Sequence, residues 1–143
     1  MKIFTIGFTK TTAQSFFDRL RKSGAKKIID VRLNNVSQLA GFAKQDDLKY
    51  FAKEICSVNY RHLPELAPTK EMLEHYKKNK GSWEEYEKRF NDLMAQRKIE
   101  QIDRDIIDGG CLLCSEDKPH FCHRRLVAEY LKDKWHDLDI VHL

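Results

Sequence analysis

The amino-acid sequence predicts an α/β fold, an open and mostly parallel sheet of about five strands with helices on both faces. Short runs rich in β-branched and apolar residues alternate along the chain with longer segments whose apolar residues recur every three or four positions. Neighbouring parallel strands need crossover connections, so this alternation favours parallel pairing. The 143 residues, of which 41% are hydrophobic, are enough for a core of their own, and we expect residues 1–143 to form a single domain.

The first thirty residues predict a strand, a helix and a second strand. Residues 2–7 have the β-branched and aromatic content of a strand. Thr11 or Thr12 is placed to cap the helix that follows, and Gly24 is placed to end it. Residues 27–31 are the second strand, so this part of the chain forms a compact unit that favours parallel pairing.

The remainder of the chain continues this alternation. Residues 32–45 have no sustained period and are predicted to form a long loop, a kind of segment that often carries function in a compact domain. Ser82 and Glu85 form a capping box at the start of a helix whose apolar stripe is predicted to be core. The other predicted elements are helices near residues 48–55, 70–78 and 122–131 and strands at residues 58–63, 111–115 and 138–143.

Charge and cysteine content limit the function classes. The formal net charge of +4 is spread over interspersed acidic and basic residues, so a nucleic-acid partner is only weakly supported. The first residues contain no long apolar region and no cleavage site, and the four cysteines are therefore expected to be free thiols in a reducing cytoplasm. No apolar run approaches the roughly 18 residues of a membrane span, so no membrane partner is expected.

The predicted strand ends carry most of the reactive side chains. Ligands of open parallel sheets bind beyond the carboxyl ends of the strands. The helix that follows the fourth predicted strand begins with Cys122, His123 and Arg124. We expect this helix start to share one edge of the sheet with the segments Gly7-Phe8-Thr9, Asp30-Val31-Arg32, Pro64-Glu65 and Cys114-Ser115-Glu116.

Three motifs stand out along the chain: Thr5-Ile6-Gly7, Asp30-Val31-Arg32, and Leu112-Leu113-Cys114-Ser115-Glu116 followed by Cys122-His123-Arg124. With these motifs the sequence resembles the domain-of-unknown-function 488 family of small bacterial and archaeal proteins. The resemblance covers essentially the whole chain, and the last motif is its most specific part. The family name brings no settled activity, so the chemistry has to be argued from the residues.

The sequence also departs from the pattern of that family. Phe8 stands where many members have His or Tyr. The loop after the second strand runs Leu33-Asn34-Asn35-Val36 where members have a Pro, and Leu66-Ala67-Pro68 stands where they have Leu-Gly-Gly. A role that the resemblance would assign to residue 8 therefore does not transfer to this chain.

Four residues are zinc ligands by type: Cys111, Cys114, Cys122 and His123. Cys111 and Cys114 lie three apart in a predicted strand, where they point to opposite faces at a separation of roughly 10 Å. Two thiolates on one zinc have to lie within about 4 Å of each other. We therefore expect no metal and no other cofactor, with Cys111 as a core residue, and keep a Cys/His metal-binding protein as a second alternative function.

Thiol or acid–base chemistry is another hypothesis for this stretch. Cys122 opens a helix next to His123, and a thiol at a helix N-terminus beside cationic groups has a lowered pKa and is more nucleophilic. Against this, Cys122 shares a helical face with Leu126 and Tyr130, the pattern of an inert buried residue, and Cys114 has the same problem within its strand. The candidate catalytic residues are Glu116, His123, Cys114, Cys122 and Asp30.

Anion binding is a third hypothesis. Backbone N–H groups at the start of the last helix, together with Arg124 and Arg32, would hold a phosphate or a carboxylate. The alternative for Asp30 and Arg32 is a buried ion pair that ties the loop to the sheet, because both residue types are costly to bury alone. The candidate ligand-binding residues are Arg32, Arg124, Thr9, Glu65 and Ser115.

Two function classes follow from these residues. The first is an enzyme that acts on a phosphorylated small molecule, a nucleotide or a nucleic-acid end. Arg32 and Arg124 would hold the anion, and Glu116, Asp30 or His123 would supply acid–base catalysis. The alternative is a non-catalytic module that senses a nucleotide or a nucleic acid through the same pocket. The sequence leaves the substrate and the oligomeric state open.

Overall fold

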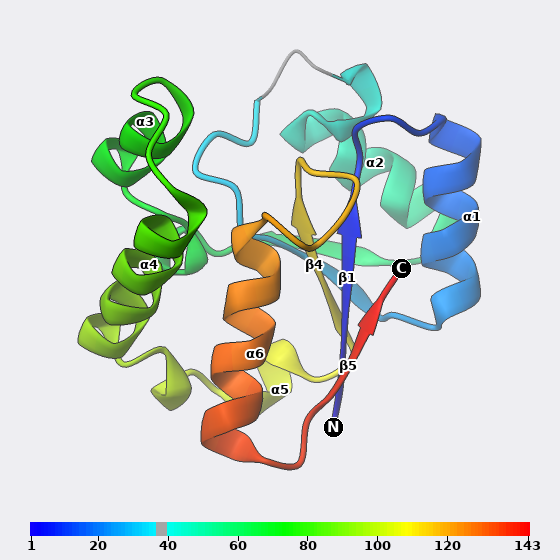
Figure 1. Ribbon diagram of the computed structural model, residues 1–143. Coiled ribbons are helices and arrows are strands. Elements are labelled where there is room, and N and C mark those ends of the chain that lie inside the picture. The colour runs from blue at the N-terminus through cyan, green and yellow to red at the C-terminus, as the bar shows by residue number, and fades with distance from the viewer. Residues whose placement is uncertain (37–39) are drawn as a thin grey trace.

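The computed structural model describes residues 1–36 and 40–143. In these residues five strands form one sheet in which all neighbours are parallel, with the order β3-β2-β4-β1-β5 (Figure 1). The strands are β1 (Lys2–Gly7), β2 (Lys27–Asp30), β3 (Asn59–His62), β4 (Gly110–Cys114) and β5 (Asp139–His142). The open parallel sheet that the sequence predicts is confirmed.

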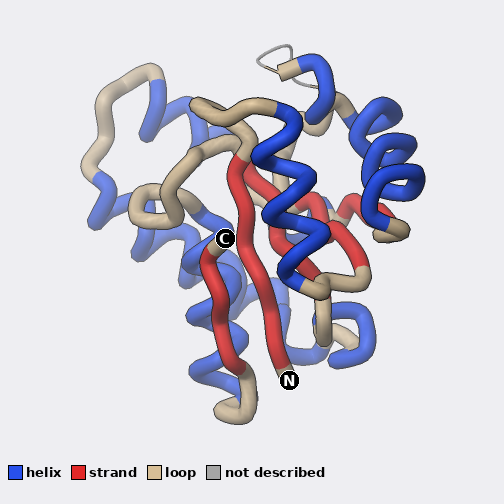
Figure 2. The backbone as a smooth tube through the Cα atoms, turned by 90° about the vertical axis from the view of Figure 1, so that its right-hand side faces the viewer, coloured by secondary structure: helices blue, strands red, loops and turns tan. Residues whose placement is uncertain are grey.

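Helices cover both faces of this sheet, as predicted. One layer consists of α1 (Ala13–Ser23) and α2 (Gln45–Cys56). The other consists of α3 (Lys70–Lys77), α4 (Trp83–Arg97), α5 (Arg104–Ile107) and α6 (His123–Trp135). Single turns of 3-10 helix lie in the connections, at Gly41–Ala43, Pro64–Leu66 and Ile99–Gln101. Figure 2 shows β1 and β5 side by side, with the two chain ends at opposite ends of this pair.

Capping side chains explain where the helices begin. Thr12 accepts a hydrogen bond from the backbone N–H of Ser15 at 3.0 Å, so α1 is capped by the second of the two candidate threonines. Ser82 caps α4 in the same way through the N–H of Glu85 at 3.1 Å, as the capping-box spacing predicts. Gly24 ends α1 at φ 79°, in the left-handed region where glycine has no steric penalty.

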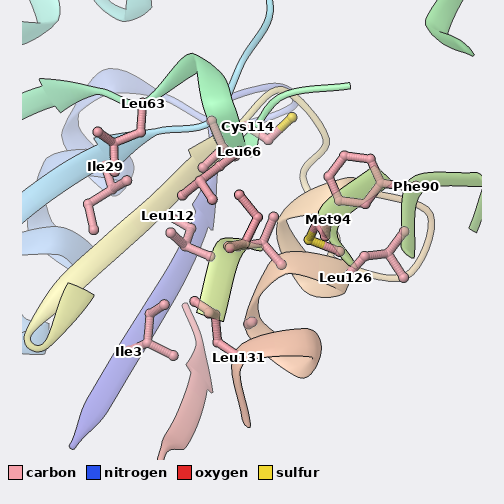
Figure 3. Packing of buried hydrophobic residues seen from close by; sticks show 14 of the residues in the cluster. Ile3, Ile29, Leu63, Leu66, Phe90, Met94, Leu112, Cys114, Leu126 and Leu131 are labelled. Atoms are coloured by element: carbon pink, nitrogen blue, oxygen red, sulfur yellow. The ribbon is translucent and has the colours of Figure 1, made fainter. Parts of the chain in front are cut away.

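β4 lies in the middle of the sheet, and its side chains alternate between two cores. Cys111 and Leu113 pack with the α1 and α2 layer, whereas Leu112 and Cys114 pack with the α4 and α6 layer. The expected opposite orientation of Cys111 and Cys114 is therefore confirmed. Figure 3 shows the second core, where side chains of the strands meet those of α4 and α6. Full burial of a leucine side chain such as that of Leu112 or Leu113 stabilises the fold by about 1.5–3 kcal/mol.

The loop predicted from residue 32 to 45 includes residues 37–39, which lie outside the described residues. Its described part contains the turn of 3-10 helix at Gly41–Ala43. Among the residues that the structure describes, no helix is long and apolar enough to cross a bilayer.

Candidate functional site

The carboxyl ends of β1, β2 and β4 meet at one edge of the sheet. Gly7 of β1 pairs in register with Cys114 of β4, and Asp30 ends β2 on the other side of β4. Beyond them, the backbone N–H and the hydroxyl of Thr9 both donate to the carbonyl oxygen of Ser115, at 3.1 and 2.8 Å. The loops that follow β1 and β4 are therefore fastened to each other at this edge.

A cavity of about 230 Å³ opens at this edge of the sheet. Its walls come from the segment after β2, from α3, from the first turn of α4 and from the loop between β4 and α6. It is slightly smaller than most small-molecule sites, which measure about 300–1,000 Å³. The predicted site residues that line it are Arg32, Cys114, Ser115, Glu116, Cys122 and His123.

Arg32 is fixed in the cavity wall by a buried carboxylate. Its Nε and Nη2 donate to the two carboxylate oxygens of Asp30 at 2.9 and 2.8 Å. The guanidinium also lies 5.0 Å from the ring centre of Phe8. Tyr60 donates a further hydrogen bond to Asp30, and burial together with this bond raises the pKa of the Tyr60 phenol. Since Asp30 and Arg32 are 0% and 3% exposed, the buried ion pair that the sequence allowed is present.

One nitrogen of Arg32 makes no hydrogen bond to the described residues. In the described part of the chain, Nη1 is buried and has no hydrogen-bond partner. Nearly all buried donors in native proteins are paired, and an unpaired one costs about 1–3 kcal/mol. Arg32 as a residue lines the cavity, so its guanidinium places a positive charge in the wall, whereas Nη1 itself is enclosed by protein atoms.

Two thiols and an imidazole converge on the cavity wall. Cys114 ends β4, Cys122 is the N-cap residue of α6, and His123 is the first residue of that helix. The two Sγ atoms and a ring nitrogen of His123 all lie within 4.8 Å of one another, and Cys114 Sγ is 3.5 Å from His123 Nδ1. His123 Nε2 lies 2.6 Å from the carbonyl oxygen of Val31. Because a carbonyl only accepts, Nε2 carries the proton, and Nδ1 is left as an acceptor toward the sulfurs.

This cluster can do two kinds of chemistry. The imidazole can take a proton from a thiol, because its free nitrogen faces the sulfur atoms. The same three side chains form a group that could hold a metal ion. Cys111 is the fourth residue whose type suits zinc. It packs in the core on the other face of β4, and the group found among the described residues does not contain it.

The surroundings of the two thiols push their pKa values apart. Burial raises the pKa of Cys122, but hydrogen bonds with Cys114 and His123 and the charge of Arg124 outweigh burial and hold that pKa well below its usual value. The pKa of Cys114 is raised, first by its hydrogen bond to Cys122 and then by burial. Cys122 is therefore the thiol of the pair that ionises first, with Cys114 as a hydrogen-bond donor to it.

Arg124 supports the loop between β4 and α6. It is fully buried and donates to Thr5 Oγ1 at 3.3 Å and to the carbonyl oxygens of Glu116 and Asp117. Arg124 is not among the described residues that line the cavity, so it has no direct contact with an anion there. Its buried charge instead acts through the lowered pKa of Cys122.

The remaining predicted residues lie near the cavity or away from it. Ser115 is among the described residues that line the cavity, whereas Thr9 and Glu65 are not. The hydroxyl of Thr9 is engaged by the carbonyl of Ser115, and Glu65 is exposed, with its carbonyl oxygen accepting from Arg97 at 2.8 Å. Asp30 lies behind Arg32 and reaches the cavity only through that side chain.

The sequence missed the aromatic side of the cavity. Tyr76, Trp83, Tyr86 and Phe121 line it together with Lys77. Trp83 and Tyr86 belong to the apolar stripe that the sequence predicts to be core. Lys77 begins the basic run Lys77-Lys78-Asn79-Lys80, which is typical of a solvated loop. The single sequence signal was Phe121, a large apolar residue that belongs to no strand or stripe.

Glu116 stands at the cavity rim in an ion pair with Lys77, with Oε1 3.0 Å from Nζ. Both side chains are about half exposed, so water screens their attraction. We expect Glu116→Gln to change the free energy of unfolding by less than about 1 kcal/mol in urea denaturation. Lys70→Gln, which removes the exposed pair with Glu74, is the matched control. A loss above about 2 kcal/mol for Glu116→Gln alone would mean that the rim pair holds the fold together.

Comparison with known proteins adds a family but no activity. The family model described as Domain of unknown function DUF488 matches residues 12–131. No curated protein and no solved structure matches the chain.

Proposed function

The chain belongs to the domain-of-unknown-function DUF488 family, and we propose that it is a thiol-dependent enzyme that hydrolyses a phosphate ester of a small molecule or nucleotide in this cavity. The observation that carries the proposal is the position of Cys122. Its thiol is on the cavity wall, at the N-terminus of α6, beside Cys114 and His123. Thiols in such positions are nucleophiles.

The charges around the cavity suit a phosphate group. Arg32 places a guanidinium charge in the cavity wall, and the first N–H groups of α6 have no acceptor within the helix. Asp30 and Arg124 act indirectly, because Asp30 orients Arg32 and Arg124 fastens the loop that carries Ser115 and Glu116.

The proposed reaction has two displacement steps. In the first, Cys122 gives its proton to Nδ1 of His123, and its sulfur bonds to phosphorus while the bond from phosphorus to the ester oxygen breaks. The ester oxygen takes the proton from His123 and leaves as an alcohol. In the second step, water attacks phosphorus, the sulfur–phosphorus bond breaks, and one proton of the water returns to the thiolate. The products are the alcohol and inorganic phosphate.

We expect Cys122 to be the first thiol that iodoacetamide modifies, at a rate that stays high at neutral pH. A free thiol has a pKa of about 8.5, and only the thiolate reacts. Because the pKa of Cys122 is lowered, its alkylation rate should fall at a lower pH than that of an ordinary thiol, as the pH drops through that lowered pKa. Cys56, Cys111 and Cys114 have raised pKa values and should react slowly. Mass spectrometry of peptides locates the label, and inorganic phosphate should slow its attachment.

Two variants separate the chemistry from the fold. Cys122→Ser should abolish hydrolysis of p-nitrophenyl phosphate, whereas Cys111→Ala, which changes a buried thiol on the other face of β4, should retain it. Metal content is measured on the same protein, purified without chelators. Turnover that survives in Cys122→Ser would overturn the proposal, and so would stoichiometric zinc together with thiols that resist alkylation.

A further inference from the structure

We propose that the aromatic end of the cavity binds a planar heteroaromatic ring, so that the phosphorylated substrate is a mononucleotide. This inference rests on the proposed function, because it takes the part of the cavity around Cys122 and Arg32 as the phosphate site. Four aromatic side chains line that same cavity: Tyr76, Trp83, Tyr86 and Phe121.

The four rings form one connected wall. The Trp83 ring is stacked on Tyr86, with ring centres 5.2 Å apart and an angle of 25° between the planes. Tyr76 and Phe121 both meet Trp83 edge to face at 5.6 Å. Tyr86 is stacked in turn on the fully buried Phe90, which anchors the wall in the core. Rings that are already held in place lose little conformational entropy when a ligand ring packs against them.

Phe121 brings this wall next to the thiol. It immediately precedes Cys122 in the chain and is 57% exposed, so its ring is open to a ligand. The start of α4, which carries Trp83, lies beside the start of α6 (Figure 1). A ring packed against Phe121 and Trp83 would therefore lie beside the sulfur that receives the phosphoryl group.

The polar groups at the rim favour a nucleobase over a plain aromatic ring. Lys77 and Glu116 stand together at the cavity edge, with their charged groups 3.0 Å apart. An ammonium donates to a ring nitrogen or carbonyl oxygen, and a carboxylate accepts from an exocyclic amino group. The edge of a nucleobase offers both kinds of partner. The cavity volume of about 230 Å³ suits one nucleotide unit rather than a folded nucleic acid.

Trp83 gives a direct signal for ring binding. The chain has two tryptophans, and the second, Trp135, lies at the end of α6, where its Nε1 donates to the carbonyl oxygen of Glu100. In Trp135→Phe, Trp83 is the single indole. We expect AMP and adenosine to quench its fluorescence saturably, and ribose 5-phosphate and inorganic phosphate to leave it unchanged. If this variant does not fold, calorimetric titration of the wild-type protein with AMP and with ribose 5-phosphate makes the same comparison.

Protection of Cys122 from iodoacetamide tests both ends of the cavity. Stacking on aromatic side chains should let AMP protect at a concentration at least about 10-fold lower than ribose 5-phosphate. Phe121→Ala should remove this advantage and leave protection by ribose 5-phosphate unchanged. Phe51→Ala, which removes an exposed aromatic residue from α2 on the other face of the sheet, should retain the advantage.

The possible results separate the two proposals. Equal protection by AMP and ribose 5-phosphate, without quenching of Trp83, would overturn the ring site and leave the proposed function standing. Quenching by AMP and adenosine without protection of Cys122 by any phosphate would support the ring site and overturn the proposed function. An advantage of AMP that survives in Phe121→Ala would overturn the wall as the binding surface.

Discussion

Replacement of Asp30 by alanine should lower the free energy of unfolding by about 3–5 kcal/mol. The substitution leaves the guanidinium of Arg32 buried without its counter-charge, because both of its bonded nitrogens donate to Asp30. It also removes the acceptor for the Tyr60 hydroxyl. Urea denaturation followed by circular dichroism measures the loss.

A double replacement identifies the cause of that loss. In the double variant Asp30→Ala with Arg32→Met, no member of the ion pair is left buried alone, so it should be more stable than Asp30→Ala. Arg32→Met by itself should abolish the protection of Cys122 by phosphate, because it removes the guanidinium charge from the cavity wall. If the two single losses simply add in the double variant, Asp30 does not act as the anchor of Arg32.

Gly7→Ala should cost about 3 kcal/mol or more, since a side chain at this position collides with backbone. A Cβ atom on Gly7 would stand 1.6 Å from the carbonyl oxygen of Glu116 and 3.1 Å from Nη1 of Arg124. The loop after β4 would have to move away, and with it the hydrogen bonds that Arg124 and Thr9 make to that loop. We therefore expect the variant to lose phosphate protection of Cys122 together with stability.

Gly41→Ala is the matched control for this substitution. Among the described residues, a Cβ atom on Gly41 meets nothing within 4 Å, and its backbone is outside the left-handed region, so alanine should be neutral or stabilise slightly. If Gly7→Ala unfolds at the same urea concentration as Gly41→Ala, the close approach of Gly7 to the loop after β4 does not exist in solution.

Much of the fold could be predicted because it depends on local patterns. The central strands read as continuous apolar runs, since both of their faces are buried, and the predicted ranges for β1 and β2 agree with the structure to within one residue. The edge strands β3 and β5 are shorter than their predicted ranges at both ends. Their apolar content continues past the last ladder pair, so composition alone could not place their ends.

The site was predictable in position but not in side-chain direction. The rule that ligands bind beyond the carboxyl ends of parallel strands correctly placed Arg32, Cys114 and Glu116 at the cavity. It gave no sign that His123 would face the cavity while Arg124, the next residue, would turn under the loop, because each step along a helix rotates the side chain by about 100°. The aromatic wall depends on how α4 packs against α6, and this is a tertiary contact that no pattern within either helix specifies.

The place of β4 in the sheet has a consequence for how the protein is made. β4 separates β1 from β2, although it follows both of them late in the chain. During synthesis the two early strands leave the ribosome without their shared neighbour, and their inner edges stay unpaired until residue 114 has emerged. Closure of the sheet and assembly of the thiol cluster are then one late event. A nascent chain that stops before β4 should therefore be recognised by chaperones and proteases. Its thiol cluster would not yet have formed.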